Sequence, residues 1–219
     1  MAAERQGRVG VLLITLPVLS NITSFIIFAP LFAPGRTATP ADYQHAGVLL
    51  GIAILLIEVI AMFSIALSLR REHTSLKSII NFQPHRMRSY LITGAVALLP
   101  TLAAGWLYSL AQAQASVESD LSRLAQGEIL LWYVVTPVAV AFLEETIWRG
   151  YAMSRTRGVW RSVLFSGLSF AFFHGIFNPL AMIATFVQGL IWGWAYRRTD
   201  STVPGMALHF ISRYLALVF

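Results

Sequence analysis

The chain has 219 residues, of which 57% are hydrophobic and only 12% are charged. Soluble domains carry about a quarter charged residues, so the composition excludes an ordinary soluble protein. The absence of cysteine excludes disulfides, thiolate catalysis and cysteine-based metal sites. The formal charge of +6 would suit nucleic acid, but the positions of the basic residues fit membrane topology better, so no nucleic-acid partner is expected.

Apolar residues gather in seven segments of about the length that a helix needs to cross a bilayer. They cover approximately residues 9–33, 46–69, 90–111, 129–151, 160–177, 179–196 and 203–219. This pattern predicts an all-α fold, a polytopic transmembrane helical bundle of about seven spans. Because no repeat or linker divides the chain, we expect a single integral membrane domain over residues 1–219, with N-terminal helices in 1–127 and core helices in 128–219.

The basic residues predict the orientation of these spans. With the N-terminus in the cytoplasm, 13 of the 16 Lys and Arg residues fall inside and only Arg36 and Arg123 fall outside, while Arg213 lies within the last span. Such an asymmetry is typical of the positive-inside rule. The inner residues are Arg5, Arg8, Arg70, Arg71, Lys77, Arg86, Arg88, Arg149, Arg155, Arg157, Arg161, Arg197 and Arg198.

Ionisable side chains within the spans are costly, so each one requires an explanation. The set is Glu58, Glu144, Glu145, Arg149, His174, His209 and Arg213. In the fourth segment, Glu145 and Arg149 have the i,i+4 spacing that favours an ion pair on one helix face. Glu144 is rotated from Glu145 by about 100°, so it is available as a base. The alternative is an ion pair near the lipid headgroups.

Two histidines lie at depths compatible with these glutamates. At about 1.5 Å per residue, Glu144, His174 and His209 can share one layer, which we expect to be reached from the cytoplasmic side. A single histidine in a span is often only a helix–helix contact, but two histidines level with two glutamates favour a site.

A carboxylate and an imidazole that converge on one water can deprotonate it for attack on a peptide carbonyl, and a further histidine can stabilise the oxyanion. The sequence contains neither G-x-S-x-G nor H-E-x-x-H. Two histidines and two glutamates can also bind Zn²⁺, but their wide spacing is not diagnostic. We therefore expect no cofactor and no metal, with a zinc enzyme as the alternative.

Three motifs in this order resemble the CAAX-protease and bacteriocin-processing (CPBP or Abi) family, which includes the type II CAAX prenyl endopeptidases. E-E-x-x-x-R is matched by Glu144, Glu145 and Arg149, and F-x-x-x-H by Phe170 and His174. The third motif, H-x-x-x-N, is matched only at His209, because Arg213 replaces the asparagine. The resemblance covers about residues 129–219.

This resemblance implies an intramembrane glutamate protease. Glu144 and His174 would activate the water, His209 and Arg213 would form the oxyanion site, and the Glu145–Arg149 pair would orient the catalytic carboxylate. Arg213 leaves other readings open, because it can face the outer surface or pair with Glu58.

The remaining polar residues have plainer interpretations. Glu58 is expected to be a structural hydrogen-bonding partner. Asn178 and Gln188 are candidates for substrate contact, as is Phe170 of the second motif, although polar contacts between helices are the commoner role of buried amides.

The leading hypothesis is an endopeptidase that cleaves a membrane-associated or lipidated peptide or protein. The expected partners are this substrate and membrane lipids, and the short loops favour the plasma (inner) membrane of a prokaryote. The alternatives are a non-enzymatic immunity or peptide-binding protein on the same fold, and a small proton-coupled transporter.

Overall fold

The computed structural model describes residues 2–113, 135–176 and 178–218, and every regular element among them is helical. The predicted all-α class is therefore confirmed. Two 3₁₀ turns (Ala29–Phe32 and Pro84–Arg86) and one π-helical segment (Glu145–Met153) accompany the α-helices. The α-helices are α1 (Ala2–Phe28), α2 (Pro40–Arg71), α3 (Leu76–Ile80), α4 (Met87–Ala113), α6 (Thr136–Glu144), α7 (Val159–Phe173), α8 (Pro179–Thr199) and α9 (Val203–Val218).

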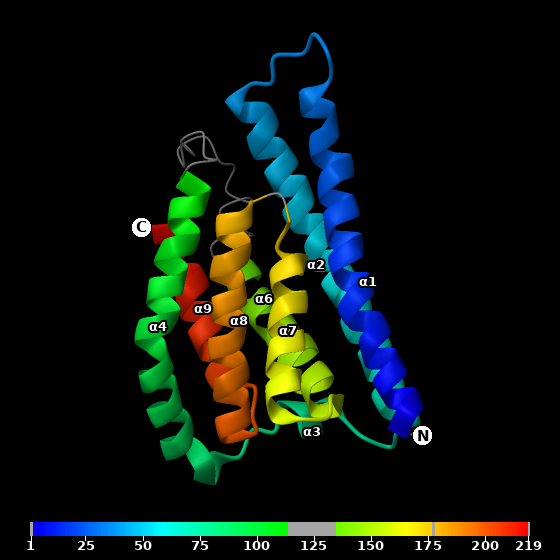
Figure 1. Ribbon diagram of the computed structural model, residues 1–219, viewed down its shortest axis with the longest axis vertical. Coiled ribbons are helices and arrows are strands. Elements are labelled where there is room, and N and C mark those ends of the chain that lie inside the picture. Colours follow the sequence, from blue (N-terminus) through cyan, green and yellow to red (C-terminus); the bar gives the residue numbers. More distant parts are fainter. Residues whose placement is uncertain (1, 114–134, 177, 219) are drawn as a thin grey trace.

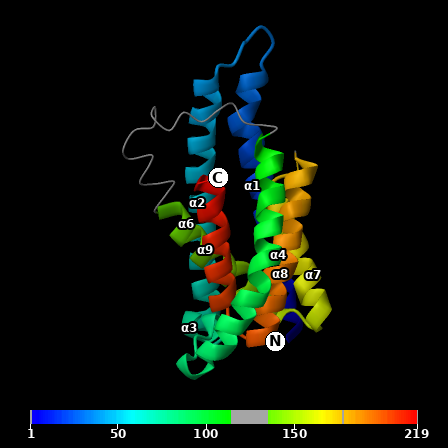
Figure 2. The same ribbon diagram turned by 90° about the vertical axis from the view of Figure 1, so that its left-hand side faces the viewer.

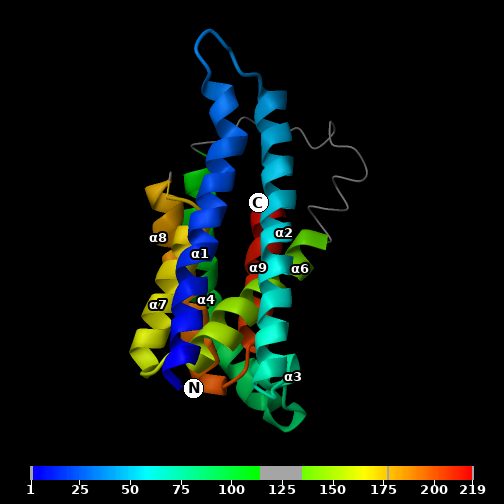
Figure 3. The ribbon, with the colours of Figure 1, turned by 90° about the vertical axis from the view of Figure 1, so that its right-hand side faces the viewer.

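The long helices run side by side along one axis (Figure 1). The hairpin of α1 and α2 flanks a group formed by α4, α7, α8 and α9. Helix α8 packs between α4 and α7, and α1 packs against α7. The short helix α6 lies between α2 and α9, as Figures 2 and 3 show from opposite sides. The fourth segment of the sequence is thus held inside the bundle by both halves of the chain.

The helices carry the lipid-facing surface of an integral membrane protein. Three of them are long and apolar enough to cross a membrane, within Gly7–Phe32, Ala41–Arg71 and Leu76–Leu110. Large apolar side chains such as Ile14 and Leu99 point outward, with 67% and 76% of their surface exposed. A soluble monomer rarely exposes so much apolar surface, whereas hydrocarbon accepts it.

Helices occupy all seven of the predicted segments, although seven complete crossings stay a prediction. In the described part of the chain, α7 has only 15 residues, about 22 Å of helix, which is shorter than the hydrocarbon core. The beginning of the fourth segment (129–134), Arg123 and Phe219 lie outside the described residues.

The ends that we expect in the cytoplasm gather at one end of the bundle. The N-terminus, α3 and the start of α7 lie there, opposite the α1–α2 loop (Figure 1). Arg155, after the π-helical segment, forms an ion pair of 2.7 Å with Glu72 at the end of α2. The backbone N–H of Thr202 donates to the carbonyl of Ile80 at 3.1 Å. The predicted inner ends therefore lie on one side of the bundle, and that this side faces the cytoplasm stays a prediction.

Helices α7 and α8 approach each other through glycines. A Cβ added to Gly189 would lie 2.8 Å from the Cα of Gly167, so α8 cannot carry a larger residue here without moving. Small residues that allow such close approach are typical of helix contacts in membranes. Beside this contact, the hydroxyl of Ser166 donates to the carbonyl of Trp148 at 2.8 Å, which joins α7 to the π-helical segment.

Candidate active site

Glu144 is the last residue of α6, at the point where the chain widens into the π-helical segment. Both Glu144 and Glu145 are buried, at 1% and 0% exposure. All nine residues of the π-helical segment are buried as well. π-Helical turns are rare and often occur at functional sites, and no residue pattern in the sequence had indicated this one.

Three helices bring a carboxylate and two imidazoles together. Oε1 of Glu144 lies 3.6 Å from Nε2 of His174, at the end of α7. Its Oε2 lies 3.5 Å from Nε2 of His209, on α9. These separations are longer than a normal direct hydrogen bond, which is about 2.9 Å between nitrogen and oxygen. The shared layer predicted for these three residues is therefore present.

The backbone determines which nitrogen of His174 faces the glutamate. Its Nδ1 lies 3.0 Å from the carbonyl oxygen of Phe170. Because a carbonyl only accepts hydrogen bonds, Nδ1 carries the hydrogen, and Nε2 of the neutral ring is an acceptor. Nε2 and the Glu144 carboxylate are then two acceptors that face each other. A water molecule that donates one hydrogen to each would satisfy both.

The second glutamate of the pair is neutralised inside the protein. Oε1 of Glu145 lies 3.0 Å from Nη1 of Arg149, and neither side chain is exposed. The guanidinium also stacks over the ring of Phe170 at 4.4 Å, and its Nη2 donates to the carbonyl of Gly189 at 3.4 Å. The i,i+4 ion pair expected from the sequence is present, and its environment is the protein core rather than the headgroup region.

Glu145 also holds the second histidine. Oε1 of Glu145 lies 3.5 Å from Nδ1 of His209, so this ring spans the two carboxylates. Its face stacks on Trp192 of α8, with ring centres 4.4 Å apart and planes at 25°. Nε1 of Trp192 in turn donates to Oγ1 of Thr101 at 3.2 Å. Sequence reasoning missed Trp192, because one tryptophan in an apolar helix carries no sign of its neighbour.

A small cavity of about 30 Å³ adjoins the two histidines. By volume it has room for about two water molecules. The nitrogen of the Gln188 side chain donates to the hydroxyl of Ser212 at 2.9 Å in its wall. The cavity is lined by Gly105, Tyr108, Phe170, His174, Thr185, Gln188, Trp192, His209, Ser212 and Arg213.

The cavity lies mainly toward the end of the bundle away from the N-terminus, and access from the cytoplasmic side stays a prediction. Most of its lining residues lie in the C-terminal half of α4, at the C-terminal end of α7 and in the N-terminal half of α8. These parts of the helices lie toward the end of the bundle away from the N-terminus (Figure 1). With the N-terminus in the cytoplasm, this is the outer half of the bundle. The depth estimate gave the level of the three groups correctly, but a distance along each helix does not indicate the direction from which water arrives.

The other predicted site residues divide into two groups. Phe170, Gln188 and Arg213 line the cavity. Asn178 does not, and instead its side-chain oxygen accepts from the N–H of Ala181 at 3.1 Å at the start of α8. Asn178 precedes Pro179 at the first helical position, which is the usual place of a capping residue. No ion pair joins Glu58 and Arg213 among the described residues.

Gly205 of α9 lies directly against Glu145, which yields a first prediction. A Cβ at this position would collide with the Glu145 carboxylate. We expect Gly205→Ala to displace Glu145 from Arg149 and His209, and to lower the free energy of unfolding by about 1–3 kcal/mol. Activity should fall more than stability, as measured by substrate cleavage and by thermal unfolding in detergent.

Gly94→Ala in α4 is the matched control, since a Cβ there meets nothing within 4 Å. It should retain activity. Unchanged cleavage by Gly205→Ala would show that the position of Glu145 is unimportant for the reaction.

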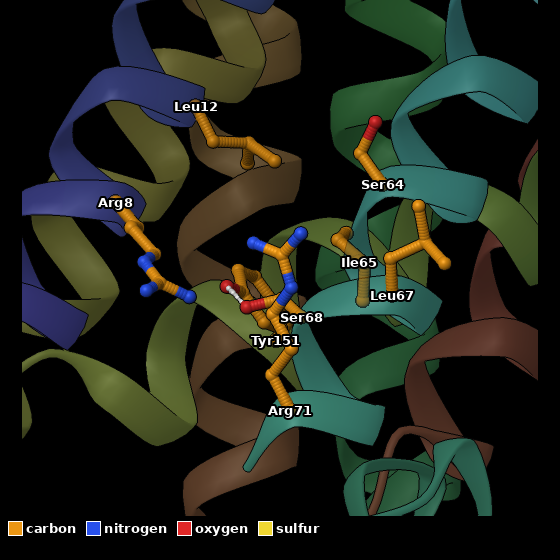
Figure 4. A pocket seen from close by; sticks show the side chains of 8 residues that line it. All are labelled: Arg8, Leu12, Ser64, Ile65, Leu67, Ser68, Arg71 and Tyr151. Carbon is orange, nitrogen blue, oxygen red and sulfur yellow. Dashed lines mark hydrogen bonds between the residues drawn. The ribbon is translucent and has the colours of Figure 1, made fainter.

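A second cavity of about 380 Å³ lies between α1 and α2 at the basic end of the bundle. Arg8 of α1 and Arg71 of α2 face it, and the hydroxyls of Ser68 and Tyr151 lie 3.1 Å apart beside it (Figure 4). None of its lining residues is a glutamate or a histidine. Because it adjoins the two histidines that face Glu144, the cavity of about 30 Å³ is the candidate active site.

Within the described residues, no group of three or more His, Asp or Glu side chains has an arrangement that could hold a metal ion. Glu144 lies close to both histidines, but the Glu145 carboxylate is already paired with Arg149 and is not free to bind a metal ion. The alternative of a zinc site therefore depends on experiment, and a chelator tests it directly.

Comparison with protein families gives one match. The family model described as type II CAAX prenyl endopeptidase Rce1-like matches residues 126–215. This range includes the Glu144 cluster, by which we mean Glu144, Glu145, Arg149, His174 and His209. The match confirms the resemblance drawn from the three motifs. No curated protein and no solved structure matches the chain.

Proposed function

Because the segment similar to Rce1-like prenyl endopeptidases is the one that carries the Glu144 cluster, we propose that this integral membrane protein is a glutamate-dependent intramembrane endopeptidase. The main support is the 3.6 Å approach of Oε1 of Glu144 to Nε2 of His174, two acceptors that converge on one position. A water molecule there is polarised by both groups, as general base catalysis requires.

The proposed reaction begins when the water oxygen attacks the carbonyl carbon of the peptide bond. Glu144 takes a proton from the water, and the carbonyl oxygen becomes an oxyanion. His209 and Arg213, which line the same cavity, supply donors to this oxygen. The C–N bond then breaks as Glu144 returns the proton to the leaving amine. The enzyme ends in its starting state, with one water consumed.

The environment of the cavity supports a particular substrate class. It lies inside a bundle whose outer surface is largely apolar, so the bond to be cleaved belongs to a substrate that is held at the membrane. We propose a membrane-associated or lipidated peptide or protein as the substrate. Membrane lipids are further proposed partners, because Arg8 and Arg71 line the second cavity at the level of anionic headgroups. The proposed location is a prokaryotic plasma membrane.

The experiment uses the full chain in nanodiscs, which leave both faces accessible. A quenched peptide library with lipidated and unlipidated members is incubated with the wild type, with and without a chelator. Glu144→Gln nanodiscs serve as the blank. Cleavage by the wild type that resists the chelator and is absent from the blank supports the proposal.

Other outcomes contradict it in distinct ways. Cleavage abolished by the chelator would replace the glutamate mechanism with a metal-dependent one. Tight peptide binding without cleavage would indicate a peptide-binding or immunity protein. Proton flux in liposomes that Glu144→Gln abolishes would indicate a transporter.

A further inference from the structure

Glu58, in the middle of α2, is a buried acid outside the segment that matches the family. Only 1% of its surface is exposed. Neither of its carboxyl oxygens accepts a hydrogen bond from any donor among the described residues. Burial of a polar group without a partner costs about 1–3 kcal/mol in proteins, so an acid at this position requires a function or a partner.

The partner is the catalytic glutamate of the proposed mechanism. Helix α2 packs against α6, and Glu144 on α6 is the side chain that acts most strongly on the Glu58 carboxyl group. Arg213 is the other charged group that acts on Glu58, from α9, at a distance beyond an ion pair. Among the described residues, Glu144 therefore acts on Glu58 more strongly than any cation does.

Two carboxylates cannot form a hydrogen bond with each other, because both only accept. A bond between them requires one proton, as in other pairs of acids that share a site. Glu144 also faces Nε2 of His209 at 3.5 Å, a ring nitrogen that can donate a hydrogen bond to the ionised carboxylate. Glu58 faces no histidine in the described structure, so the shared proton belongs on Glu58.

We propose that Glu58 is a positioning residue that carries this proton and donates a hydrogen bond to the Glu144 carboxylate. The inference rests on the proposed function and extends it to a helix that the family match does not cover. One oxygen of Glu144 faces His174 and the other faces His209. A third contact, from Glu58, fixes the plane of the carboxylate and thus the direction of the lone pair that receives the proton from water.

Substitutions that differ only in donor capacity test this role. Glu58→Gln keeps an N–H donor in nearly the same place, whereas Glu58→Met keeps the volume and loses the donor. We expect Glu58→Gln to retain kcat within about tenfold of the wild type, and Glu58→Met to lose about 10- to 100-fold in kcat with KM little changed. Thermal stability of Glu58→Met should be equal or higher, since an apolar side chain suits a buried site.

The pH profile provides a readout that a purely structural role would not change. In the wild type, activity should fall at high pH when Glu58 loses its proton and two negative carboxylates face each other beside Arg213, His174 and His209. In Glu58→Gln this proton cannot be lost, so the alkaline limit should move to higher pH. Glu72→Gln, at the end of the same helix in an ion pair with Arg155, is the matched control and should leave the profile unchanged.

Infrared spectroscopy tests the proton without any substrate. A protonated carboxyl group in an apolar site gives a separate carbonyl band, which should be present in the wild type and in Glu72→Gln, and absent from Glu58→Gln. Full activity of Glu58→Met, a folded but inactive Glu58→Gln, or a wild type without the band would each overturn the inference. A wild type that shows the band but cleaves nothing would count against the proposed function alone.

Discussion

Glutamine in place of Glu144 is expected to lower kcat/KM about 10²- to 10⁴-fold, the usual contribution of a general base. The amide has the shape of the carboxylate but cannot accept a proton from water. His174→Gln should produce a loss in the same range, because the water then loses its second acceptor. The rate constants are measured with the best substrate found in the nanodisc library.

The double substitution distinguishes a shared role from two separate ones. Groups that act on one water should be non-additive, so the pair of changes should cost little more than the larger single loss. Losses that multiply would place Glu144 and His174 in different steps. His85→Gln is the control, since this histidine is exposed near the start of α4 and should leave the rate unchanged.

Loss of the Arg149 guanidinium should have the largest effect on stability. Its ion pair with Glu145 is completely buried, and removal of one partner leaves an uncompensated charge in the core. We expect Arg149→Met to lower the free energy of unfolding by about 3–5 kcal/mol. Arg149→Lys retains the charge but not the planar group that contacts Phe170 and the carbonyl of Gly189, so it should be intermediate.

Thermal unfolding in detergent measures both changes, with Arg155→Met as the comparison. Arg155 pairs with Glu72 at the end of the bundle, where 10% of each side chain remains exposed, so its loss should cost less than the loss of the completely buried Arg149. Equal losses for Arg149→Met and Arg155→Met would contradict a special contribution of the buried pair.

The sequence predicted this site because polar residues are rare and expensive in apolar helices. Glu144, His174 and His209 stood out for that reason, and their depths along the helices agree with the level at which the structure joins them. The spacing of Glu145 and Arg149 predicted their pair because the interaction is local to one helix. The spacing of residues along one helix, and the presence of a polar residue in an apolar segment, can both be read directly from a sequence.

The sequence was not sufficient to predict which side chains meet across two helices. Glu58 lies toward Glu144 because α2 packs against α6, and the spacing of residues in either segment does not predict this packing. The stacking of His209 on Trp192 similarly depends on how α8 and α9 are rotated about their axes. Asn178 was assigned to substrate contact on polarity alone, although its position before Pro179 is typical of a helix cap.

The widened turn after Glu144 has a consequence for insertions and deletions. A π-helical segment contains more residues per turn than the α-helices on either side, so it determines how far α6 is rotated relative to the chain beyond Met153. Deletion of one residue between Glu145 and Met153 would rotate α6 by about 100° and point Glu144 away from both histidines. The α1–α2 loop at residues 33–39 should tolerate the same deletion, because it joins two helices outside the site. Chain length in this short buried stretch is therefore as strictly constrained as the identity of the acids.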